Sequence, residues 1–132
     1  MTESEFNSWL EKYGSAWENQ DADAVSTIFT ETGTYAWGPV TDPIRGRQAI
    51  HAAWEHATKG QQEDIKFGHE VLAVTETRGI ARWWASMTVK STGQKVRMEG
   101  IFLVTLTADG LCSEFREWWN EDPPATDAAE YQ

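Results

Sequence analysis

Four segments in the second half of the chain constrain its fold more than any other feature. Residues 65–74, 79–90, 96–107 and 111–119 are rich in β-branched and aromatic residues, and the short turn signals TETR, STGQ and ADG separate them. Each segment has the length and composition of a strand, and connections this short join neighbours that run in opposite directions. The sequence therefore predicts an antiparallel meander of four strands.

The first half of the chain shows helical spacing instead. Apolar and aromatic residues recur every three or four positions through residues 4–18, which predicts a first helix. Asp21 can cap a second helix, whose predicted apolar face is Val25, Ile28 and Phe29. A short strand at 34–37, a proline-containing loop at 38–46 and a third helix at 47–60 complete this half.

Three helices followed by a strand-rich half predict an α+β fold, with the helices on one face of a strongly curved, mostly antiparallel sheet. The chain has 132 residues, which is the size of one ordinary domain. We expect that domain to span residues 1–120. The acidic, proline-bearing segment 121–132 is expected to be a disordered tail.

The charge of the chain excludes several classes of partner. Twenty-one acidic residues against eleven basic ones give a net charge of −10, which repels nucleic acid and anionic membranes. No apolar run approaches the roughly 20 residues of a membrane span, and the polar N-terminus is unlike a signal peptide. A single cysteine permits no internal disulfide. We therefore expect a cytoplasmic protein that binds neither nucleic acid nor membrane.

Alternation along the strands predicts which face is buried. The uncharged faces, expected to point toward the helices, are Ala81, Trp83, Ala85 and Met87 on one strand and Met98, Gly100, Phe102 and Val104 on the next. Trp84 and Ile101 then lie on the opposite, otherwise polar face. Exposed apolar side chains on such a face predict a homodimer that forms through the outer face of the sheet.

The order of these elements resembles the NTF2-like superfamily, in particular small SnoaL-like proteins and the ketosteroid isomerases. The stretches that carry the resemblance are AWENQDADAVSTIFTETGTY, PIRGRQAI and the ending EFREWWN, at matching spacing over about residues 4–120. The resemblance implies a conical fold in which three helices close a bent sheet over a deep apolar pocket. Because this superfamily hosts many chemistries, it implies no single function.

Two activities of these relatives can be compared with this chain. By resemblance, the tyrosine of the ketosteroid isomerases falls on Tyr13, but their two carboxylates fall on Trp37 and Phe102, so their aspartate-base mechanism is excluded. By resemblance to the limonene-epoxide hydrolases, Tyr35 matches the tyrosine that holds their attacking water, and Glu117 matches one aspartate of their proton relay. Their remaining relay residues fall on Ala81 and Trp83, and that relay is also incomplete.

Glu117 is the first candidate catalytic residue. By alternation it points the same way as Phe115 and Trp119, into the predicted pocket, where burial would raise its pKa and suit it to proton transfer. The alternative is that a β-bulge turns Glu117 outward, or that Arg116 or another base pairs with it at the rim. A bulge is favoured by Cys112 and Phe115, which both look buried but differ in parity.

His69, Tyr13 and Tyr35 are the other candidates. His69 shares the inward face of its strand and could form an acid–base pair with Glu117, although a histidine satisfied by one hydrogen bond is the alternative. The tyrosines are pocket hydroxyls by resemblance, or else simply pack. No third ligand accompanies His69 and Glu117, so neither a metal nor another cofactor is expected.

The sequence contains eight tryptophans, and several fall on inward positions. Either these residues line a small aromatic pocket for an apolar ligand, or they fill the interior and leave no pocket. The predicted ligand-binding residues are Trp17, Trp37, Trp54, Phe67, Trp83, Met87, Met98, Phe102 and Trp119. The expected function is a cofactor-free acid–base enzyme acting on a small apolar molecule, with a non-catalytic ligand-binding protein or a dimerisation module as the alternatives.

Overall fold

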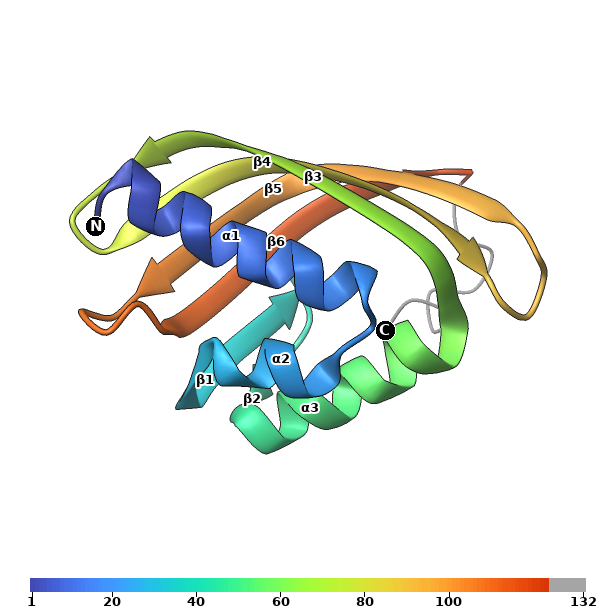
Figure 1. The fold of residues 1–132 in the computed structure, drawn as a ribbon, viewed down its shortest axis with the longest axis horizontal. Coiled ribbons are helices and arrows are strands. Elements are labelled where there is room, and N and C mark those ends of the chain that lie inside the picture. The colour runs from blue at the N-terminus through green and yellow to red at the C-terminus, as the bar shows by residue number, and fades with distance from the viewer. Residues whose placement is uncertain (124–132) are drawn as a thin grey trace.

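The computed structural model describes residues 1–123 and shows a strongly curved six-stranded sheet with its helices on one face (Figure 1). Three helical elements precede most of the sheet: α1 (Glu3–Glu18), α2 (Ala22–Thr27) and α3 (Arg47–Trp54). A π-helical turn, η1 (Glu55–Lys59), extends α3. The strands are β1 (Phe29–Trp37), β2 (Ile44–Arg45), β3 (Gln62–Val74), β4 (Arg78–Val89), β5 (Lys95–Leu106) and β6 (Cys112–Asp122).

The strands follow the order β2-β1-β6-β5-β4-β3 across the sheet. The pairs β3–β4, β4–β5 and β5–β6 are all antiparallel, which confirms the predicted meander. The short strand expected at residues 34–37 begins earlier, at Phe29, and pairs in parallel with β6. This pairing brings Tyr35 and Trp37 beside Phe115 and Glu117, respectively.

The helices begin where the sequence predicts. Thr2 and Glu5 form a reciprocal cap at the start of α1, and the Asp21 carboxylate accepts a hydrogen bond from the Ala24 N–H at the start of α2. Two details of the prediction are wrong. Helix α2 ends at Thr27, so Phe29 belongs to β1, and the α-helix α3 ends at Trp54, after which the chain continues as the π-helical turn.

The predicted inward faces of β4 and β5 are confirmed. The side chains of Trp83 and Phe102 are at most 1% exposed, and their neighbours on the same faces are buried except Gly100. Trp84, on the opposite face, is 39% exposed. The core therefore lies between the helices and this face of the sheet.

A β-bulge at the start of β6 explains why Cys112 and Phe115 are both buried. Leu106 pairs with Cys112 and Thr105 pairs with Glu114, which leaves Ser113 as the extra residue. The bulge lies before Phe115, and regular alternation then carries Glu117 to the buried face. The alternative in which a bulge turns Glu117 outward is therefore wrong.

The last strand runs beyond the predicted domain end. Glu121 and Asp122 belong to β6, where they pair with Met98 and Arg97. Residues 124–132 of the predicted tail lie outside the described residues. None of the helices within residues 1–123 is long and apolar enough to cross a membrane.

Candidate functional site

A small cavity lies between the helices and the inner face of the sheet. Its volume is about 40 Å³. Helix α1, the α3–η1 segment and every strand except β2 contribute side chains to its wall. We call this space the inner cavity. The tryptophans thus leave only a small space in the interior.

Glu117 is the one carboxyl group on the wall of the inner cavity, within the described residues. It is 8% exposed and forms no hydrogen bond or ion pair with any residue from 1 to 123. Burial raises the pKa of Glu117 from its ordinary 4.5 to about 8, because the charged form loses its hydration. At neutral pH the group is mostly a carboxylic acid, which can donate a proton or a hydrogen bond.

Tyr13 and Tyr35 lie on the same wall and form a pair. Their hydroxyl oxygens are 2.6 Å apart, and each side chain is 2% exposed. Burial raises the pKa of both tyrosines well above 10, and the negative charge that Glu117 gains on ionisation adds to the effect. One hydroxyl donates to the other, so one proton of the pair is left for a third group.

Phe115 packs against both tyrosines. Its ring is stacked on Tyr35 with centroids 4.4 Å apart and on Tyr13 at 5.3 Å. The parallel pairing of β1 with β6 sets Tyr35 directly beside Phe115, while α1 brings Tyr13 from the opposite side. The hydroxyl pair is thus positioned by buried aromatic packing.

All five tryptophans that were predicted to line a pocket lie on the wall of the inner cavity: Trp17, Trp37, Trp54, Trp83 and Trp119. The indole N–H of Trp17 donates to Gln62 Oε1 at 3.0 Å. The indole N–H groups of Trp54 and Trp83 are buried and have no hydrogen-bond acceptor among residues 1–123. The Trp54 N–H faces the Tyr35 hydroxyl and lowers the pKa of that tyrosine, against larger effects that raise it, although the contact is too poor in geometry to satisfy the N–H. Unpaired buried donors of this kind favour an external acceptor.

Three wall residues were not identified from the sequence: Ala57, Thr58 and Gln62. The first two belong to the π-helical turn, and Gln62 opens β3. The Gln20 side-chain amide donates to the carbonyl oxygens of both Thr58 and Gln62, which ties this segment to the end of α1. A regular helix over 47–60 gave no indication of this arrangement.

His69 does not lie near Glu117. It is on β3, at the far edge of the sheet, and its register partner on β4 is Trp83. Across β5 and β6 the same row continues with Gly100 and Trp119. Three strand spacings separate His69 from β6, or roughly 14 Å. Its Nε2 is 2.9 Å from Asn7 Oδ1, and partial burial lowers its pKa. The predicted acid–base pair of His69 and Glu117 is therefore wrong, and the single-hydrogen-bond alternative describes His69 instead.

Three of the predicted ligand-binding residues are absent from the wall of the inner cavity: Phe67, Met87 and Phe102. Phe102 is stacked on Trp83 with centroids 5.0 Å apart, and Phe67 is stacked on Trp83 at 6.3 Å. All three share the inward face but do not reach the cavity wall: Met87 and Phe102 belong to the core, and Phe67 is partly buried against it. Met98 does reach the wall.

The fold and the cavity define a class of protein. A bent sheet closed by helices over an aromatic cavity, with tyrosine hydroxyls and a buried acid on its wall, is the arrangement expected of the NTF2-like superfamily. The model of the SnoaL-like domain matches residues 10–115, and the chain belongs to this family.

Solved structures with the same fold include two enzymes by description. One is SalBIII, an epoxide hydrolase/cyclase-like enzyme with a role in pyran ring formation in the polyether salinomycin: 19% identity, 86% of this chain and 89% of that chain covered, TM-score 0.75. Another is a putative isomerase from Bacillus subtilis: 21% identity, 91% and 90% covered, TM-score 0.77. At these identities the likeness shows the fold alone. No curated protein matches the chain.

Proposed function

We propose that this protein is a cofactor-free enzyme that transfers a proton to or from a small, uncharged, largely apolar substrate, with Glu117 as the acid–base group. The observation that carries the proposal is a buried carboxyl group on the wall of an aromatic cavity, with no hydrogen bond or ion pair to any residue from 1 to 123. Burial raises its pKa to about 8. A group with a pKa close to the working pH is suited to proton transfer. The free energy spent on burying it is otherwise unexplained.

The neighbours of Glu117 support a role at an oxygen atom of the substrate. The Tyr13–Tyr35 pair can donate one hydrogen bond into the same space, and a donor aimed at developing negative charge stabilises a transition state. Epoxide opening, ring closure and isomerisation all place negative charge on an oxygen. The two structural neighbours, one epoxide hydrolase/cyclase-like and one a putative isomerase by description, are consistent with this set of reactions.

The pH profile separates the two possible roles of Glu117. If it acts as the acid, the rate is constant well below pH 8 and falls as the pH rises through about 8, because the proton to be donated is lost. If it acts as the base, the rate rises over the same range. Because the acid form predominates at neutral pH, we expect the first profile. A profile without an inflection between pH 7 and 9 would contradict either role.

Substitution of Glu117 tests the proposal. We expect the wild-type protein to accelerate either the opening of styrene oxide or the exchange of α-protons of 2-tetralone in deuterated water. Glu117→Gln keeps the shape of the side chain but loses the proton transfer, so its rate should fall by about 10²- to 10⁴-fold. Glu114→Gln, on the outer face of the same strand, is the matched control and should retain the wild-type rate.

A non-catalytic ligand-binding protein is the alternative. Such a protein would use the same cavity without needing proton transfer. Glu117→Gln would then leave the affinity for a bound ketone nearly unchanged, and neither reaction would be accelerated by the wild-type protein. That pair of results would replace the enzyme with a binder.

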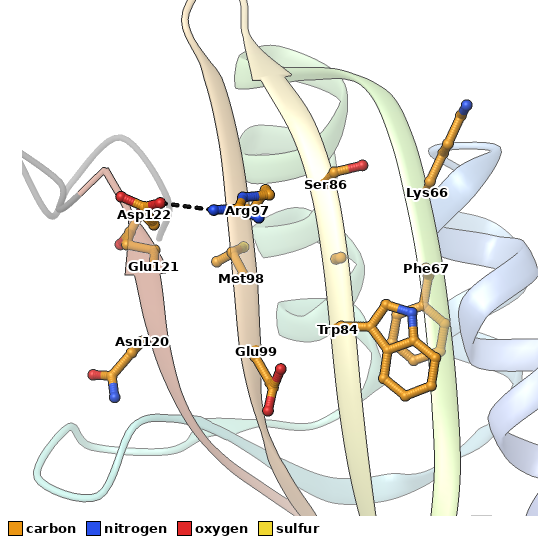
Figure 2. A pocket seen from close by; sticks show the side chains of 11 residues that line it. Lys66, Phe67, Trp84, Ser86, Arg97, Met98, Glu99, Asn120, Glu121 and Asp122 are labelled. Carbon is orange, nitrogen blue, oxygen red and sulfur yellow. Dashed lines mark hydrogen bonds and ion pairs between the residues drawn. The ribbon is translucent and has the colours of Figure 1, made fainter.

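We also propose that two copies of the chain associate through the outer face of the sheet. Trp84 and Ile80 are each 39% exposed there, beside the half-buried Ile101. Arg82 bridges Glu70 and Glu99. Arg97 pairs with Asp122 (Figure 2). The charges of this face are therefore largely matched in a chain that carries −10 overall. A charge-balanced face with apolar side chains suits a self-complementary interface.

Light scattering measures this association directly. The wild-type protein is expected at twice the chain mass of 14.9 kDa, and Trp84→Glu at the mass of one chain, because the new charge would be buried against its symmetry mate. Val40→Glu, which alters an exposed residue of the loop after β1, is the control and should stay a dimer. A wild-type mass equal to that of one chain would contradict the proposal.

A further inference from the structure

A second depression adjoins the inner cavity. It has a volume of about 510 Å³, and the residues that form it include Gly38, Pro39, Ile101 and Trp118. We call it the outer groove. Trp37 and Trp119 line both the outer groove and the inner cavity, and each is only half-buried. These two indoles are therefore the boundary between the two spaces.

The groove opens where the sheet loses a strand. The last pair between β1 and β6 is Trp37 with Glu117, so from Trp118 onward β6 has no paired strand on that side among residues 1–123. Gly38 then turns the chain away with a φ of +125°, a conformation that side chains other than hydrogen rarely allow. The exposed edge of β6 and this turn leave the indoles of Trp37 and Trp119 between the surface and Glu117.

The two volumes decide how a ligand can be accommodated. Pockets that bind small molecules have volumes of about 300–1,000 Å³. The inner cavity, at about 40 Å³, has room for a group of very few atoms, whereas the outer groove falls within the usual range. A ligand that reaches Glu117 must therefore place a small group in the inner cavity and the rest of its body in the outer groove.

The polar groups around the inner cavity define the chemistry of that small group. Trp54 and Trp83 each have a buried indole N–H that no residue from 1 to 123 satisfies, and an indole nitrogen can only donate. The tyrosine pair has one proton to spare, while Gln62 Oε1 already accepts from Trp17. No lysine, arginine or histidine lies on this wall within residues 1–123, so a buried anion would have no countercharge. These donors fit an uncharged oxygen.

We propose that the ligand consists of an uncharged acceptor oxygen, as in a ketone, ether or epoxide, held by the donors of the inner cavity, and a flat apolar body that lies in the outer groove against Trp37, Trp118 and Trp119. The proposal rests on the function proposed above, since it describes the substrate of that same site. It adds two specificity determinants. Trp37 and Trp119 limit the width of a ligand that can reach the inner cavity, and the N–H groups of Trp54 and Trp83 favour a ligand with an oxygen over one without it.

Two probes that differ by one atom test this assignment. Acetophenone carries the oxygen, and α-methylstyrene has the same shape with a CH₂ group in its place. Each is titrated into the full-length protein well below pH 8, and the nitrogen–proton NMR signals of the eight indoles are followed. We expect acetophenone to shift the signals of Trp54 and Trp83 as well as those of Trp37 and Trp118. Without the oxygen the buried donors stay unpaired, so α-methylstyrene should bind about tenfold more weakly.

Three variants separate the head of the ligand from its body. Trp83→Phe should weaken acetophenone by about fivefold or more and leave α-methylstyrene unchanged, because only the N–H donor is lost. Trp118→Ala should weaken both probes alike. Val40→Ala is the control, since this fully exposed side chain lines neither the inner cavity nor the outer groove, and it should change neither affinity.

Equal affinity for the two probes, shifts that leave Trp54 and Trp83 unaffected, or no shift of any indole signal would overturn the proposal. None of these measurements requires turnover. If the probes behave as expected while Glu117→Gln leaves the rate unchanged, the ligand assignment stands and the enzymatic function fails. If Glu117 controls the rate but the probes are not distinguished, the reverse holds.

Discussion

Glu117→Gln is expected to stabilise the folded protein, and the gain should increase with pH. In the wild type the folded state holds the proton of Glu117 up to a pH of about 8, whereas the unfolded chain loses it near 4.5. Well below pH 4.5 the carboxyl group is protonated in both states, so its ionisation does not change the free energy of unfolding. As the pH rises from 4.5 to 8, ionisation favours the unfolded chain more and more, so the wild type loses stability over this window.

The size of the effect follows from the difference between the two pKa values. A shift from 4.5 to about 8 corresponds to roughly 4–5 kcal/mol at pH 9, and to roughly 3 kcal/mol at pH 7. Glutamine cannot ionise and retains the shape of the side chain, so the variant avoids this loss. Total stabilities of small domains are about 5–15 kcal/mol, which makes the difference easy to detect.

Urea unfolding of the wild type and Glu117→Gln at pH 4, 7 and 9 measures this prediction. The two proteins should have nearly equal free energies of unfolding at pH 4, with the variant more stable at pH 7 and more stable still at pH 9. Glu114→Gln, with the same chemical change on the outer face, controls for general charge effects and should follow the wild type. A variant that is less stable than the wild type at pH 9 would contradict the account.

Phe115→Ala is expected to cause the largest loss of stability among single substitutions in the core. The side chain is fully buried, and its ring lies within 4.7 Å of the Phe102 ring centre and 4.4 Å of the Tyr35 ring centre. Removing it deletes a large apolar surface and leaves a cavity that stacked aromatic rings cannot easily collapse into. Substitutions of this kind cost about 3–5 kcal/mol.

Thermal and urea unfolding at neutral pH measure the effect, and Leu72→Ala, at a residue that is 52% exposed, is the control. The control should change the free energy of unfolding by at most about 0.5 kcal/mol. Because Phe115 supports both Tyr13 and Tyr35, we also expect their ring signals to lose their separate chemical shifts in Phe115→Ala. A loss of stability no larger than that of Leu72→Ala would show that the aromatic cluster does not hold the site together.

The strands and their buried faces could be predicted because a side chain on a strand has only two directions to choose from. Trp83 and Phe102 follow from alternation alone, and Glu117 follows once the bulge at Ser113 is placed before Phe115. The parallel pair of β1 and β6 could not be predicted in this way. It joins segments about 80 residues apart, and no local pattern encodes which edge of the meander receives β1.

The candidate site was predicted in type but not in detail. His69 shares the inward face with the cavity residues, yet the sheet is several strands wide, so a shared face does not imply proximity. Phe67 and Phe102 were placed by the same argument, yet neither reaches the cavity wall: Phe102 is core and Phe67 is partly buried against the core. Thr58 and Gln62 depend on a π-helical turn, whose single extra residue leaves no signature in the spacing of apolar residues.

The raised pKa of Glu117 affects both the stability of the fold and the proposed chemistry. A carboxyl group that has no partner among residues 1–123 and lies among indoles destabilises the folded state at neutral pH, and methionine would fill the same space without a buried polar group. Residues that lower stability in this way are concentrated at functional sites. Glu117 is therefore the group through which the whole account is most open to test.

The titration of Glu117 itself is the most direct measurement. In protein labelled with ¹³C at the glutamate side-chain carboxyl carbon, the signal that disappears in Glu117→Gln identifies this residue, and its chemical shift is then followed with pH. The account predicts a midpoint close to pH 8. A midpoint near the ordinary 4.5 would mean that the carboxyl group is hydrated, and it would contradict the buried acid on which the proposed function depends.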